Sequence, residues 1–324
     1  SFEEAVSLFL SNVQTGDYEF ILFKKTLFGP KDLQQFTPIL LEAQKRDIHS
    51  AYVTSLLNEL GFSHMKNHPG YTVRIQTLGA FRVWLGQKEV EERDWQRAKA
   101  KELLELFVTE RKRMIPKEEI FANLWPDQEE KTVTRDFKVA LNTLNKVLEP
   151  NRKPREEPFF IQRTGSSYGL NLHSGYTIDC VVFEEWARLG LEARDKEQSL
   201  QYLQQAIHMY QGDFLPDQKY ADWCLTERER LLVYFLRAAE KLAQLLVSKK
   251  DYNQAIEWCE RILEKDETWE EAYRLIMYCY YQNNNRPQAM KYFAKCKEKL
   301  AEELGIEPMQ STLKMYEVIM GKAN

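Results

Sequence analysis

The sequence has no run of apolar residues that approaches the roughly 20 needed to cross a bilayer. It begins SFEEAVSLFL, with acidic residues where a secretory signal carries a basic region. We therefore expect neither a leader nor a membrane partner, and we predict a cytoplasmic protein. The chain also lacks an initiator methionine, so we expect a further N-terminal part upstream of Ser1.

Cysteine and histidine are scarce, at five residues each among 324. The number of cysteines is odd and no C-x-x-C pair occurs, which is typical of buried thiols in a cytoplasmic protein. His64 and His68 have the i,i+4 spacing of a helical zinc pair, but the adjoining Pro69-Gly70 favours a loop. We expect no metal site and no bound cofactor.

Motifs that carry enzymatic chemistry are missing as well. The sequence contains no G-x-x-x-x-G-K-[ST] phosphate loop, no G-x-S-x-G nucleophile elbow and no H-E-x-x-H zinc motif. Its abundant acidic residues are explained by the surfaces of helices. We therefore do not expect an enzyme, which leaves two kinds of binding protein: a DNA-binding regulator, or an interaction scaffold of helical repeats without a role at DNA.

The chain divides into three blocks. Residues 1–69 carry helical patterns and end at the break Asn67-His68-Pro69-Gly70. Residues 70–172 open with YTVRIQTLGAFRVWLGQ, whose alternation of apolar and polar residues is typical of strands, and continue with three helical patterns. The hairpin pattern FFIQRTGSSYGLNL closes this block, with Ser166 and Ser167 expected at its tip. This order of elements predicts a winged helix-turn-helix.

Residues 173–324 are almost wholly helical in pattern and contain a repeat. The pattern Q-A-x-x-W at Gln254 recurs as Q-A-x-x-Y at Gln288, an offset of 34 residues that equals the tetratricopeptide period. Ala255 and Ala289 are predicted to pack where two helices touch. The stretch ADWCLTERERLLVYFLRAAEKLAQLLVSKK has no breaker and predicts one long helix. The fold class is thus mainly α with a small β component.

The third helical pattern of the middle block, residues 131–148, has two opposite faces. At 100° per residue, Phe137, Leu144 and Leu148 fall in a narrow apolar stripe, with Leu141 at its edge. A charged face on such a helix is often merely solvated. Here a short helix before it and a hairpin after it favour insertion into a DNA major groove. The polar face carries Lys131, Arg135, Lys138, Asn142 and Lys146.

Charge is distributed unevenly along the chain. Residues 71–172 hold 19 Lys+Arg and 16 Asp+Glu, a net charge of +3, whereas the whole chain has a net charge of −4. The positive potential is therefore local, as a DNA-docking surface requires. Because the patch is modest, we expect a homodimer or paired half-sites to supply the affinity.

The three blocks resemble known regulators. Residues 71–172 resemble the OmpR-type winged helix, and residues 173–321 resemble the bacterial transcriptional activator domain that follows it in the Streptomyces antibiotic regulatory protein family. The resemblance is carried by RIQTLGAFRVWLGQ, KELLELF, EEIFANLWPD, TIDCVVFEEW, QGDFL before ADWCLTERERL, and LAEELGIEP. Residues 1–69 are similar to the end of the helical repeats in large MalT-like regulators, which would place an ATPase and sensor module upstream.

This resemblance implies a sequence-specific transcription activator whose third helix enters the major groove of promoter direct repeats. Its wing would touch the adjacent minor groove, and its helical domain would mediate dimerisation or contact RNA polymerase. The family commonly has arginines where Asn142, Thr143 and Asn145 stand here, which implies a different base preference and a weaker salt dependence. The sequence leaves open whether a small-molecule effector binds. The predicted DNA contacts are Lys131, Thr132, Thr134, Arg135, Asp136, Lys138, Val139, Asn142, Thr143, Asn145, Lys146, Arg163, Thr164, Ser166 and Ser167.

Overall fold

The structure is a computed structural model that describes residues 1–26, 32–63, 65, 67–171 and 175–321. The chain forms two compact units, and each is described by itself. Unit 1 comprises Ser1–Ile178 and Leu215–Thr226, and unit 2 comprises Asp179–Phe214 and Glu227–Asn324. The domain boundary predicted between residues 172 and 173 lies outside the described residues, as does His64.

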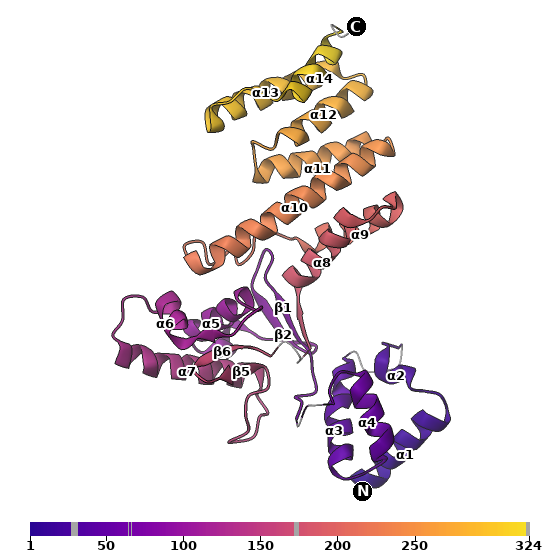
Figure 1. Cartoon of the computed structure of the whole chain (residues 1–324), viewed down its shortest axis with the longest axis vertical. Helices are drawn as coiled ribbons and strands as arrows, with labels where there is room; N and C mark the ends of the chain where they lie inside the picture. Colours follow the sequence, from indigo (N-terminus) through magenta and orange to yellow (C-terminus); the bar gives the residue numbers. More distant parts are fainter. Residues whose placement is uncertain (27–31, 64, 66, 172–174, 322–324) are drawn as a thin grey trace. The chain divides into compact units, whose positions relative to one another are not determined.

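Unit 1 opens with a helical part, shown in indigo in Figure 1. Leu10, Leu40 and Leu57 come from three different helices and are fully or almost fully buried in one common core. The helical segment predicted before the winged helix is therefore confirmed. Its elements are α1 (Phe2–Thr15), α2 (Phe20–Phe23), the 3-10 helix η1 (Leu33–Phe36), α3 (Thr37–Lys45) and α4 (Ser50–Glu59).

The rest of unit 1 contains two small sheets around three helices. One sheet has the strand order β3-β2-β1-β7 and the other has the order β4-β6-β5. Strands β1 and β2 are antiparallel, with Val73 opposite Leu85. The elements are β1 (Val73–Gln76), β2 (Arg82–Leu85), β3 (Lys88–Glu89), η2 (Glu92–Trp95), α5 (Ala98–Thr109), β4 (Ile115–Pro116), α6 (Lys117–Leu124), α7 (Glu130–Leu148), β5 (Ile161–Thr164), β6 (Ser167–Leu170) and β7 (Tyr176–Ile178).

Strand β7 was not predicted, and it changes where the winged helix ends. It pairs in parallel with β1, placing Tyr176 beside Val73, so the sheet continues to Ile178. Pro116 directly precedes the first residue of α6 with an extended ψ of 142°, and it belongs to β4.

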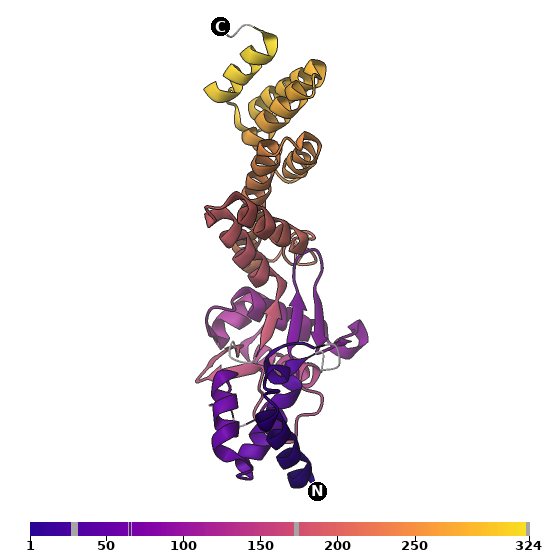
Figure 2. The same cartoon turned by 90° about the vertical axis from the view of Figure 1, so that its right-hand side faces the viewer.

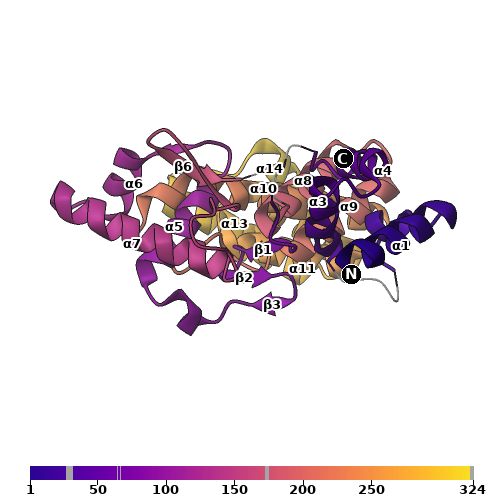
Figure 3. The same cartoon turned by 90° about the horizontal axis from the view of Figure 1, so that it is seen from below.

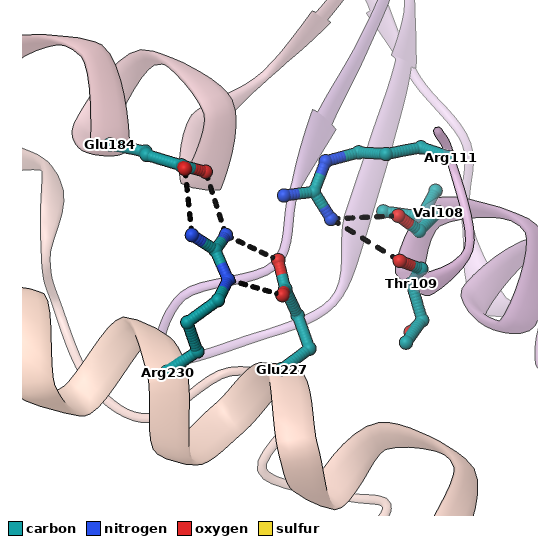
Figure 4. Close-up of polar contacts among 6 residues, drawn as sticks. All are labelled: Val108, Thr109, Arg111, Glu184, Glu227 and Arg230. Atoms are coloured by element: carbon teal, nitrogen blue, oxygen red, sulfur yellow. Dashed lines mark hydrogen bonds and ion pairs between the residues drawn. The ribbon is translucent and has the colours of Figure 1, made fainter. Parts of the chain in front are cut away.

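Helix α5 forms the centre of this part of unit 1. Leu103, Leu104 and Phe107 are buried, as their pattern predicts, and the helix packs against α7. After α5 the chain turns under Arg111, whose guanidinium donates to the carbonyl oxygens of Val108 at 3.2 Å and Thr109 at 3.4 Å (Figure 4). These bonds engage carbonyl groups that a helix end leaves without partners along the helix.

Unit 2 is helical throughout its described residues. Its elements are α8 (Asp179–Glu192), α9 (Lys196–Met209), the long helix α10 (Asp222–Ser248), whose first five residues belong to unit 1, α11 (Tyr252–Lys265), α12 (Glu270–Gln282), α13 (Arg286–Leu304) and α14 (Gln310–Met320). Figures 1 and 2 show α11 to α14 as successive layers of helices. Arg230 of α10 holds α8 in place by donating to both carboxylate oxygens of Glu184 at 2.7 Å (Figure 4).

The 34-residue repeat is visible in the helix starts. Asp251 caps α11 by accepting from the backbone N–H of Gln254, and Asn285 caps α13 by accepting from that of Gln288, both at 3.3 Å. Ala255 and Ala289 are completely buried, which confirms their predicted packing role. All five cysteines are buried thiols. Among the helices of the described residues, none is long and apolar enough to cross a membrane.

Candidate nucleic-acid interface

Helix α7 is amphipathic over its 19 residues, and its apolar face is sealed. Five residues spaced four, three, four and four positions apart lie at or below 3% exposure: Val133, Phe137, Ala140, Leu144 and Leu148. This spacing keeps one side of an α-helix in contact with a core over its whole length. Figure 3 shows α7 lying beside α5 in unit 1.

Phe137 joins α7 to its neighbours. Its ring meets Phe121 of α6 at 5.4 Å, Trp125 at 6.4 Å and Tyr168 of β6 at 5.1 Å, each in an edge-to-face arrangement. Such aromatic pairs add stabilisation beyond the area they bury. One buried side chain therefore fixes α7 against both the preceding helix and the terminal hairpin.

The opposite side of α7 lies open to solvent within unit 1. We call it the open face: Lys131, Arg135, Lys138, Asn142 and Lys146, all exposed. At 1.5 Å per residue these side chains span about 22 Å of helix. In the described part of the chain its three lysines make no ion pair, and Arg135 reaches only its neighbour Asp136, with Nε 3.1 Å from Oδ1.

The hairpin of β5 and β6, which we call the wing, has a two-residue turn at Gly165-Ser166 because Thr164 pairs with Ser167. The φ of Gly165 is +61°, which glycine adopts readily, and this conformation fits a type II′ turn. Ser167 lies on the strand β6, not at the tip, which corrects the prediction. Arg163 crosses the hairpin and donates from Nε to the carbonyl oxygen of Gly165 at 2.8 Å.

The open face and the wing meet at a groove of about 640 Å³, which we call the wing groove. Lys138 and Asn142 enter it from α7, and Arg163 enters it from β5. The structure thus brings these three predicted residues together with a fourth, Asn145, which also lines the groove. The other predicted residues do not line this groove: Lys131, Thr132, Thr134, Arg135, Asp136, Val139, Thr143, Lys146, Thr164, Ser166 and Ser167.

Asn145 is a correction to the predicted contacts. Its side chain is 6% exposed, and its amide oxygen has no hydrogen-bond partner among the described residues. It lines the wing groove together with Glu157 and Pro158 of the segment that leads into β5. Its side chain is therefore largely closed to solvent, unlike those of the open face.

Two further residues of the wing groove escaped the sequence reasoning: Gln162 and Tyr168. Tyr168 pairs with Arg163 across the hairpin, and the guanidinium carbon lies 5.7 Å from the centre of its ring. If the turn had been predicted at its two residues, Gly165 and Ser166, the resulting strand register would have placed Tyr168 opposite Arg163. The sequence analysis did not consider this register.

Glu149 holds the wing to the end of α7. Its buried carboxylate accepts from the backbone N–H groups of Phe159 at 2.8 Å and Phe160 at 3.2 Å. Burial raises the pKa of Glu149, although these two hydrogen bonds oppose the rise. The residue that follows α7 thus binds the two residues that precede β5, which ties the end of the helix to the start of the wing.

The chemistry available at this surface is recognition rather than reaction. Lysines act on phosphates as point charges, whereas Arg135 and Asn142 can also bond base edges. The exposed carboxylate of Glu157 lines the wing groove and opposes a phosphate there. Within the described ranges no cluster of histidine, cysteine and carboxylate side chains could hold a metal ion.

Comparisons with known proteins bear on both units. Residues 178–320 match the sequence profile of a family described as "Bacterial transcriptional activator domain". No curated protein matches the chain. This part of the chain is therefore similar to transcription activators.

Among solved structures, Mycobacterium tuberculosis EmbR in complex with a low-affinity phosphopeptide is similar at a TM-score of 0.66 and 18% identity. The similarity covers 78% of this chain and 66% of the EmbR chain, so this chain spans slightly less than two thirds of EmbR. It shows a shared fold, which supports the predicted fold class. The TPR2AB domain of yeast Sti1 in its pHSP90 complex covers 71% of this chain and 97% of its own at 15% identity, but its TM-score is 0.24.

Proposed function

We propose that this chain is a sequence-specific DNA-binding transcription activator. Its open face would enter the major groove of a promoter element, and its wing would lie along the adjacent minor groove. The observation that carries the proposal is the open face itself: four cations and an amide in a row on α7, opposite a fully sealed apolar face. The family match of residues 178–320 supports the activator role.

The dimensions of α7 suit this role. A helix with its side chains is about 10–12 Å across, and the major groove of B-DNA is about 12 Å wide. The row of about 22 Å exceeds the groove width. Side chains at both ends of the row can therefore reach phosphates while those at its centre face base edges.

Individual roles follow from side-chain chemistry. Arg135 can bond guanine O6 and N7, and Asn142 can bond adenine N6 and N7, each in a bidentate manner. The ion pair of Arg135 with Asp136 is exposed, and such pairs contribute about 0–1 kcal/mol, so a base can replace it at small cost. The lysines supply affinity without sequence information.

The activator domain would mediate dimerisation on repeated half-sites or contact RNA polymerase. Four cations on one helix provide modest affinity for a monomer, because non-specific binding rests on the number of phosphates neutralised. Two half-sites bound together would raise the effective affinity well above that of one.

A selection experiment tests the proposal. The chain is mixed with a pool of random duplexes, and bound DNA is recovered over several rounds. The affinity of the enriched duplexes is then measured by fluorescence anisotropy at 50 and 200 mM salt. We expect an enriched repeated element whose binding weakens steeply with salt. The alternative, an interaction scaffold, predicts no duplex binding even at low salt.

Two variants of the open face distinguish recognition of bases from electrostatic attraction to phosphates. Asn142→Ala should relax the preference at one base position and change non-specific binding little, whereas Lys146→Ala should weaken all duplexes alike and reduce the salt slope by about one. Equal effects of the two variants on all sequences would contradict base reading by α7.

A further inference from the structure

Unit 2 holds a groove that the proposed DNA interface does not use. It lies between α9 and α11, with α10 between them as its floor (Figure 1), and its volume is about 770 Å³. Pockets that bind small molecules measure about 300–1,000 Å³. We call it the α9–α11 groove.

The floor of the α9–α11 groove is apolar and its rim is polar. Ile207, Phe235 and Leu242 line it and are buried. Exposed amides stand at the rim, Gln204 on α9 and Gln254 on α11. Polar and apolar residues contribute about equally to the lining, so the groove offers an apolar floor for the body of a ligand and polar groups that can orient it.

One face of α11 supplies the recognition groups. Gln254, Trp258, Arg261 and Lys265 follow one another at intervals of four, three and four residues, and all four line the groove. The Lys265 ammonium is already paired with Asp213 at 2.9 Å. Arg261, in contrast, has no carboxylate within ion-pair distance among the described residues; its guanidinium carbon lies 4.7 Å from the centre of the Trp258 ring.

This stacking matters because it holds a free cation in place. A guanidinium resting on an indole loses part of its freedom before any anion arrives, and its donors at the ring edge stay available. The indole N–H of Trp258 also has no acceptor among the described residues, whereas that of Trp269 donates to Glu240 at 2.8 Å.

The 34-residue repeat offers an internal comparison. Tyr292 stands on α13 where Trp258 stands on α11, and its hydroxyl donates to Glu260 at 2.6 Å while its ring stacks on Tyr280 at 5.7 Å. In the second copy of the pattern, the aromatic residue is thus already bound by side chains of the chain itself. In the first copy the Gln254 amide donates to Asp251 at 2.6 Å, whereas Trp258 lines the groove and its indole N–H has no acceptor among the described residues.

We propose that the α9–α11 groove binds a small organic anion with an aromatic or aliphatic body and one acidic group. The body would lie on the apolar floor against Trp258, and the acidic group would bond Arg261. Glu264 on the same rim disfavours a second negative charge on the ligand. This site belongs to unit 2, and the proposal does not rest on the proposed DNA interface.

The probe for this site is 8-anilinonaphthalene-1-sulfonate, which joins an aromatic body to a single sulfonate. Its neutral counterpart, N-phenyl-1-naphthylamine, has the same rings without the charge. Each is titrated into the full chain labelled with ¹⁵N at its indoles, and the Trp258 indole resonance is assigned from the Trp258→Phe variant. We expect a saturable shift of this resonance with the sulfonate.

Replacing Arg261 separates anion recognition from apolar binding. Arg261→Gln should weaken the sulfonate about ten-fold or more, because a hydrogen bond to a charged group contributes about 1.5–3 kcal/mol and each 1.4 kcal/mol is ten-fold. The neutral probe should change less than about two-fold. The control is Lys295→Gln, at the equivalent exposed position 34 residues later, which should leave both probes unaffected.

Two results would overturn the proposal. If the Trp258 resonance does not respond to saturating sulfonate, the groove does not take this class of ligand. If Arg261→Gln binds the sulfonate as tightly as the unmodified chain does, Arg261 does not recognise the acidic group. Neither readout involves DNA, so failure here leaves the proposed function standing.

Discussion

Removing two cations from the open face of α7 should weaken DNA binding without unfolding the protein. The double variant Arg135→Ala with Lys138→Ala changes two exposed side chains; that of Arg135 is 73% exposed. Its one ion pair joins it to the adjacent Asp136. Alanine has the highest helix propensity, so α7 should keep its structure.

The magnitude follows from counterion release. Each neutralised phosphate contributes about −0.9 to the slope of log affinity against log salt, so losing two lowers the slope by about 1.8. If the affinities of the two proteins converge at 1 M salt, the variant binds about 60-fold more weakly at 0.1 M. Anisotropy of a labelled duplex at five salt concentrations measures both quantities.

The matched control removes two exposed cations from α13, Lys291→Ala with Lys295→Ala, which changes the net charge equally. We expect this control to bind within about two-fold of the unmodified chain, since its cations lie on α13 of unit 2 and not on the open face. If the α7 double variant keeps the original affinity and slope while melting normally, α7 is not the DNA-binding helix.

Three further predictions concern stability. Burial lowers the pKa of His68 to about 4, so the full stability of the fold is present above pH 6.5, where His68 is neutral in both the folded and the unfolded chain. The free energy of unfolding should fall by about 3 kcal/mol as the pH is lowered from 6.5 to 4. His68→Phe should therefore make the melting temperature less dependent on pH over that range. A variant that melts with the same pH dependence would assign the effect elsewhere. Asn145→Leu should raise the free energy of unfolding by about 1 kcal/mol, because it removes an unpaired buried oxygen. The same variant should leave DNA affinity unchanged. A loss of DNA binding would show that Asn145 contacts DNA. Ala289→Glu should lower the free energy of unfolding of unit 2, measured in urea, by about 3 kcal/mol or more, because it places a charge at a buried position. Ala301→Glu, on the exposed side of α13, should change this free energy little. If both variants were equally stable, the repeat packing would be contradicted.

Features set by local periodicity could be predicted from the sequence. The apolar stripe of residues 131–148 was sufficient to orient α7, because a 3.6-residue repeat places its apolar members on one side whatever the partner. The repeat at Ala255 and Ala289 predicted helix packing for the same reason, since small residues at equal positions of two repeats meet equivalent neighbours.

Features that depend on distant parts of the chain could not be predicted in this way. Strand β7 has three residues, and its partner β1 lies about 100 residues earlier, so no local pattern reveals it. Asn145 falls about 80° from Phe137 on the helical wheel, close to exposed Lys138. It is nevertheless buried, and it shares the lining of the wing groove with Glu157 and Pro158, which lie more than ten residues further along the chain. The α9–α11 groove depends on the spacing of two helices, which the sequence does not encode locally.

Lysine reactivity offers the most direct test of the central claim, because it requires no substitution in α7. The chain is acetylated briefly, alone and bound to its selected duplex, and each lysine is quantified by mass spectrometry. The account predicts that Lys131, Lys138 and Lys146 become several-fold less reactive in the complex, while Lys291 and Lys295 of α13 react as before. Equal reactivity of the three α7 lysines with and without DNA would contradict it.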